Sequence, residues 1–205
     1  MTDSKRKKRE GQAKTSYHHG DLRAALLAEG LRLLEEREDA DLSLRELARA
    51  VGVSATAVYR HFPDKGALRE ALAQAAYDRL GQAQRAAAAG LDNVLDEFQA
   101  TGRTYVRFAL DHPALFRLMS SIAPHGDLFD LTAEDNDEAG RLLRAYAVRI
   151  AGEGASVEAA RTIAMRAWAL VHGLAVLMLD GYVPRDEALI DAVVDTRALG
   201  MAGRR

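Results

Sequence analysis

GVSATAVYRHFPDK, residues 52–65, is the stretch that decides the fold of this chain. Gly52 stands where a tight turn between two helices needs a positive φ angle, and Ser54 can cap the helix that begins after it. One face of that helix has small side chains at its start, Ala55 and Thr56, and polar ones further on, Tyr59 and Arg60, which suits the major groove of DNA. The other face is apolar and consists of Ala57, Val58 and Phe62. The stretch therefore predicts the turn and second helix of a helix-turn-helix motif.

The segments on either side complete a small helical head, which we expect to span residues 17–65. Apolar residues at helical spacing predict a first helix over residues 21–37. Ser43 and Glu46 have the spacing of a capping box and predict the start of a short helix. Asp64 is expected to cap a long helix that connects the head to the rest of the chain.

Residues 66–200 predict a larger helical body. Helical patterns of apolar residues recur after Gly90, with a short helix expected to begin at Pro113. Thr132 and Ser156 are the expected caps of two longer helices. No stretch alternates between polar and apolar residues as a strand would. The predicted fold class is therefore all-α, with about nine helices in a head and a body.

Charge is distributed unevenly along the chain. The net charge of −2 gives no global sign of nucleic-acid binding, but residues 1–16 hold six basic side chains against two acidic ones. This segment lacks apolar periodicity, so we expect a disordered basic arm. Two interpretations remain open: the arm tracks the minor groove or nearby phosphates, or it is a solvated tail that adds nonspecific attraction.

Several classes of protein find no support in the sequence. The chain has no cysteine, which excludes disulfides and thiol chemistry and fits a cytoplasmic location. The longest apolar run, residues 167–179, is short for a bilayer, so no membrane span is expected. The histidines are too isolated to predict a metal site, and no P-loop, dinucleotide-binding or nucleophile motif is present. We therefore expect neither enzyme activity nor a cofactor.

The helix-turn-helix stretch resembles the TetR-type family of bacterial transcriptional regulators. The family's pattern Tyr-x-His-Phe-x-x-Lys occurs here as Tyr59, His61, Phe62 and Lys65, and residues 17–23 resemble the opening of a subset of these regulators. One departure is Gly66, where an acidic residue is common. The resemblance implies a homodimer whose heads bind a palindromic double-stranded DNA operator and whose bodies bind a small effector.

The C-terminal part resembles a subgroup of this family. Its marks are residues 105–109, residues 112–119, and a Trp-x-x-x-His-Gly motif at Trp168, His172 and Gly173. This resemblance is less specific than that of the head.

The predicted DNA-contacting residues lie on and around the second helix of the motif: Arg45, Ser54, Ala55, Thr56, Tyr59, Arg60, His61 and Lys65. Tyr59 and Lys65 are best placed for phosphates, which position a protein without reading the base sequence. Thr56 and Arg60 are candidates for base edges, although Arg60 suits a phosphate equally well. Arg45 is either a guanine contact or a solvated helix charge.

An apolar effector is the expected ligand of the body. The candidate lining residues are Phe108, Phe116, Met119, Met165, Trp168 and His172. The alternative for each of them is an ordinary place in the core, and for His172 a hydrogen-bonded core or interface position.

The last two long helices are the expected dimer interface, because the segment from Ser156 to Asp180 is apolar nearly all round. Val171 and Ala175 represent the side that we expect to face the partner. The sequence thus predicts a ligand-responsive repressor. The alternative is a helical protein-interaction dimer without DNA binding, followed by a helical enzyme that modifies small molecules.

Overall fold

The computed structural model describes residues 19–37, 40–122, 127–132 and 137–195, and these form nine α-helices without a strand. The helices are α1 (His19–Glu35), α2 (Leu44–Val51), α3 (Ala55–Tyr59), α4 (Lys65–Ala88), α5 (Val94–Asp111), α6 (Pro113–Ser121), α7 (Glu138–Ala151), α8 (Val157–Leu179) and α9 (Glu187–Val194). The predicted all-α class is confirmed. The basic arm predicted for residues 1–16 lies outside the described residues.

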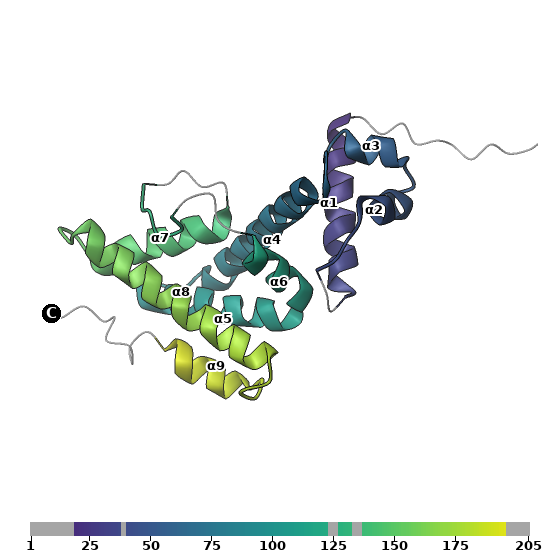
Figure 1. Ribbon diagram of the computed structural model, residues 1–205. Helices are drawn as coiled ribbons and strands as arrows, with labels where there is room; N and C mark the ends of the chain where they lie inside the picture. Colours follow the sequence, from purple (N-terminus) through teal and green to yellow (C-terminus); the bar gives the residue numbers. More distant parts are fainter. Residues whose placement is uncertain (1–18, 38–39, 123–126, 133–136, 196–205) are drawn as a thin grey trace, which may run out of the picture.

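The head and the body are joined by one long helix. Figure 1 shows α1, α2 and α3 gathered at one end of the molecule, while α4 leads from them into the bundle formed by α5 to α9. Leu68, Leu72, Ala76 and Leu80 form an i, i+4 stripe on α4, and all four are buried. A single apolar cluster includes this stripe together with side chains of the head and the body. The apolar cores of the head and the body are therefore continuous through α4.

Most helix starts follow the predicted caps. The hydroxyl of Ser54 accepts a hydrogen bond from the Ala57 amide (3.2 Å), and Ser43, Asp64 and Ser156 cap α2, α4 and α8 in the same way. The turn between α2 and α3 has Gly52 at φ 74°, in the left-handed region that glycine adopts readily.

The predicted cap at Thr132 is wrong. Its hydroxyl donates a hydrogen bond to the carboxylate of Asp130 (2.7 Å), so it belongs to a local turn. Helix α7 starts later, where the Asp137 carboxylate accepts a bond from the Gly140 amide (2.5 Å).

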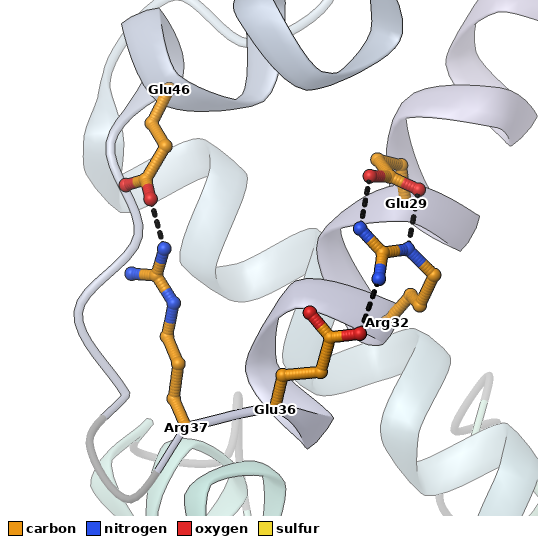
Figure 2. A network of polar contacts seen from close by, with 5 residues as sticks. All are labelled: Glu29, Arg32, Glu36, Arg37 and Glu46. Atoms are coloured by element: carbon orange, nitrogen blue, oxygen red, sulfur yellow. Dashed lines mark hydrogen bonds and ion pairs between the residues drawn. The ribbon is translucent and has the colours of Figure 1, made fainter.

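Polar contacts tie the head elements to one another and to the body. Figure 2 shows Arg32 between the carboxylates of Glu29 on α1 and of Glu36 directly after it, and Arg37 paired with Glu46 at the start of α2. Arg69 of α4 donates to the carbonyl oxygen of Ala40 (3.3 Å) and to the hydroxyl of Ser121 on α6 (2.8 Å). Exposed pairs of this kind add little stability, but they orient the segments they join.

Helix α8 is the one described helix that is long and apolar enough to span a membrane by length and composition. Core helices of other proteins meet the same criteria, and α8 packs against α5, α7 and α9. Only 28% of its most apolar window is buried in the single chain. A substantial apolar surface of α8 thus remains uncovered by this chain.

Candidate DNA-binding surface and ligand cavity

The second helix of the motif is anchored by its apolar face. Val58 and Phe62 are 0% and 1% exposed, and the amide of Phe62 donates to the carbonyl oxygen of Val58 (2.9 Å), which extends the helical turn beyond α3. The guanidinium of Arg23 on α1 lies 5.5 Å from the centre of the Phe62 ring. This anchoring leaves the opposite face of α3 toward solvent.

The predicted DNA-contacting residues lie largely on that solvent face. Six are exposed, namely Arg45, Ser54, Thr56, Tyr59, Arg60 and Lys65, and two are half-buried, namely Ala55 and His61. Tyr59 is 45% exposed. Contact of these residues with DNA stays a prediction.

The basic side chains on this surface differ in whether they already form ion pairs within the protein. Within the described part of the chain, Arg45 and Arg60 take part in no ion pair, in contrast to most arginines of the body. Lys65 pairs with Asp41, and this hydrogen bond lowers the pKa of the Asp41 carboxyl. Arg49, which was not among the predicted contacts, is also exposed, one turn after Arg45 on α2, so the i, i+4 spacing places both on the same side of that helix.

The body contains a cavity of about 70 Å³ among α4, α5, α7, α8 and α9. It is lined by Tyr77, Gln84, Phe98, Thr101, Gly102, Tyr105, Leu128, Asp137, Ala139, Gly140, Leu142, Leu143, Ala167, Trp168, Leu170, Val171 and Val194. Because a single water needs roughly 10–15 Å³ of such space, the cavity has room for a small molecule of several heavy atoms. Mainly apolar walls with a few polar groups are typical of ligand sites.

Only one predicted effector residue, Trp168, lines this cavity. Phe108, Phe116 and Met119 are buried in the core of α5 and α6, as the alternative interpretation had it. Met165 is 44% exposed on the outside of α8.

His172 lies directly behind Trp168. The two rings are stacked with centroids 4.5 Å apart and an interplanar angle of 9°. Nδ1 of His172 is 3.0 Å from the hydroxyl of Tyr105, and burial lowers the pKa of this histidine. A neutral imidazole that accepts the Tyr105 proton fits this arrangement. His172 therefore supports two residues of the cavity wall.

The polar wall residues were missed by sequence reasoning. Burial, followed by the charge of Asp137, raises the pKa of Tyr77 to about 12, so its hydroxyl keeps its proton. Gln84 is 7% exposed and continues the buried i, i+4 stripe of α4 beyond Leu80. A glutamine on an otherwise apolar stripe is the sequence signal that would have found it.

Two family descriptions match the chain, one for each part of the fold. Residues 26–72 match the bacterial regulatory proteins of the tetR family, and residues 98–197 match the tetracyclin repressor-like C-terminal domain. The chain belongs to the TetR family. Membership makes it a DNA-binding transcriptional regulator by class, and the first match contains the whole helix-turn-helix.

Solved structures agree with this assignment. A protein of unknown function from Rhodococcus sp. RHA1 is 34% identical, with a TM-score of 0.66 over 92% of this chain and 97% of that chain. A TetR family transcription regulator from Marinobacter aquaeolei VT8 has the same fold at 19% identity, with a TM-score of 0.61 over 89% of this chain and 96% of that one.

Curated relatives match over a part of their length. The nucleoid occlusion factor SlmA of Marinomonas sp. (strain MWYL1) is 29% identical over 112 residues, which are 55% of this chain and 57% of that protein. The uncharacterized HTH-type transcriptional regulator Rv1255c of Mycobacterium tuberculosis is 29% identical over 93 residues, which are 45% of this chain and 46% of that protein. The chain thus aligns with about half the length of these relatives.

Proposed function

We propose that this TetR-family protein is a cytoplasmic homodimeric repressor that leaves a palindromic operator when a small apolar effector binds its body. The observation that carries the proposal is the position of α4. This helix starts at Lys65, directly after the recognition segment, and forms part of the cavity wall through Tyr77 and Gln84. One rigid element therefore borders both the ligand cavity and the DNA-binding head.

The effector acts through α4 in this proposal. A ligand shifts an equilibrium between two arrangements only by its difference in affinity for them. A molecule that fits the cavity better when α4 is displaced favours that displacement, and the contacts of Arg69 with Ala40 and Ser121 pass it to the head. The spacing of the two heads then no longer matches the two half-sites.

In this proposal some side chains position the protein by binding phosphates, and others read the base sequence. Tyr59 binds a phosphate, Thr56 reads base edges, and Arg60 and Arg45, which form no ion pair among the described residues, can reach either. Lys65 reaches a phosphate by releasing Asp41.

The dimer uses the outer face of α8. Val171 and Ala175, chosen from the sequence to represent the partner side, are 8% and 0% exposed and face the chain's own core, so that choice of face was wrong. Met165 and Leu177 are each 44% exposed on the other side. Between them, a Cβ added at Gly173 meets open space, so a partner helix can approach closely there.

The test is salt-dependent binding of the full chain to the DNA upstream of its own gene. Retention in a gel shift that is competed by the same duplex, and not by a scrambled one, supports the proposal. A dimer in sedimentation that retains no duplex supports the alternative of a helical protein-interaction dimer. An apolar compound that binds without altering DNA retention contradicts the effector part alone.

A further inference from the structure

Most polar groups of the cavity wall already have protein partners. The hydroxyl of Thr101 donates to the carbonyl oxygen of Phe98 (2.7 Å), and that of Tyr77 lies 3.5 Å from the carbonyl oxygen of Met119. The Tyr105 hydroxyl is bound to the imidazole behind the wall. These groups line the cavity with their hydrogen-bonding capacity largely used.

Gln84 is different. Its Nε2 donates to the carbonyl oxygen of Thr101 (3.1 Å), and this bond fixes which way the amide is oriented, because the reverse would place two acceptors face to face. Its Oε1 is buried and has no hydrogen-bond partner among the described residues. A buried acceptor without a donor destabilises a structure, and such groups are rare unless a ligand or water supplies the donor.

The charges near the cavity also restrict its ligand. The lining includes no lysine, arginine or histidine among the described residues, so a bound anion would touch no cationic side chain of the wall. The Asp137 carboxylate is part of the wall, which disfavours a second carboxylate further. A neutral molecule is what these walls accommodate.

We infer that Gln84 selects the effector: the ligand is a small, neutral, mainly apolar molecule whose single hydroxyl or N–H group donates a hydrogen bond to Oε1 of Gln84. This inference rests on the proposed function of the cavity as the effector site. Gln84 stands in the last two turns of α4. The hydrogen bond from the ligand to Gln84 is therefore made to the helix that leads to the head. Recognition of the ligand's donor group and displacement of α4 then occur in the same step.

Matched ring compounds test this selection. Pyrrole and furan have the same shape, but pyrrole carries an N–H where furan has an oxygen, and indole and benzofuran form the corresponding larger pair. Calorimetric titration of the full chain should give about tenfold tighter binding of each N–H compound than of its oxygen counterpart. Quenching of Trp168, the single tryptophan of the chain, provides a second readout for pyrrole and furan.

Gln84→Leu should bind both members of a pair with the same affinity. The control is Gln82→Leu, since Gln82 is exposed on the same helix and should keep the wild-type preference. Equal affinities in the wild type, or a preference that survives Gln84→Leu, overturn the inference. If Gln84→Leu does not fold, N-methylindole gives the same decision with the wild type, because it lacks the donor and should bind as weakly as benzofuran. If no ring compound binds while DNA is still retained, the effector role of the cavity is overturned together with the selection.

Discussion

Replacement of Arg60 by alanine should weaken DNA binding and leave the fold intact. Arg60 is exposed and forms no ion pair among the described residues, so the free energy of unfolding should change by no more than about 0.5 kcal/mol. A lost guanine contact costs about 1–3 kcal/mol per head, and a dimer carries two heads, so the operator complex should weaken by about 2–6 kcal/mol. A lost phosphate contact instead makes the negative slope of log K against log salt shallower by about 0.9 per head.

The assay is fluorescence anisotropy of a labelled operator at several salt concentrations, with Arg32→Ala as the matched control. Arg32 lies in the same head and carries the same charge, but it forms ion pairs with Glu29 of α1 (2.7 Å) and with Glu36, which directly follows α1 (2.5 Å) (Figure 2). The control should therefore bind the operator with nearly wild-type affinity. Equal affinity losses in both variants would refute a contact of Arg60 with DNA, because they would show an effect of net charge alone.

Three further changes test other parts of the account. Deletion of residues 1–14 should keep the sequence preference but flatten the salt dependence by about 0.9 per phosphate released, and an unchanged slope means that the arm does not touch DNA. Leu177→Glu, on the outer face of α8, should give folded monomers in sedimentation at micromolar concentration, and a persistent dimer contradicts this interface. Burial lowers the pKa of His172, so the unfolded chain binds that proton more readily and stability falls as the pH drops from about 7 to 5. His172→Gln should lose less stability than the wild type over that range in denaturant titrations, and parallel curves count against a neutral His172.

The local features of the head were predictable from sequence because they depend on neighbours along the chain. A serine hydroxyl can cap a helix by accepting a hydrogen bond from the amide three residues later, so Ser43 and Ser54 were identified correctly from local sequence. The predicted cap at Thr132 was wrong because α7 begins further along the chain, where Asp137 caps it, while Thr132 belongs to a turn with Asp130.

The cavity was mostly not predictable, for a physical reason. Apolar periodicity separates buried from exposed positions, but it does not say which buried side chains border empty space. Phe116 and Trp168 both stand at apolar positions whose helical spacing predicts burial, yet only Trp168 lines the cavity. On α8 the apolar residues nearly surround the helix, so the sequence predicted a second partner, but Val171 and Ala175, which were expected to face it, are buried in the chain's own core. In the single chain Leu177 is exposed and Ala175 is buried, which is why the proposed interface uses the Leu177 side.

Selection of bound duplexes from a random pool, with the full chain, tests the central claim most directly. The account predicts enrichment of a palindrome whose half-sites are about 10 base pairs apart, or a multiple of that, because two heads meet successive turns of the major groove. Two chains should be present on each selected duplex. A pool that stays unenriched, or that yields single half-sites occupied by one chain, would contradict a dimeric operator-binding regulator.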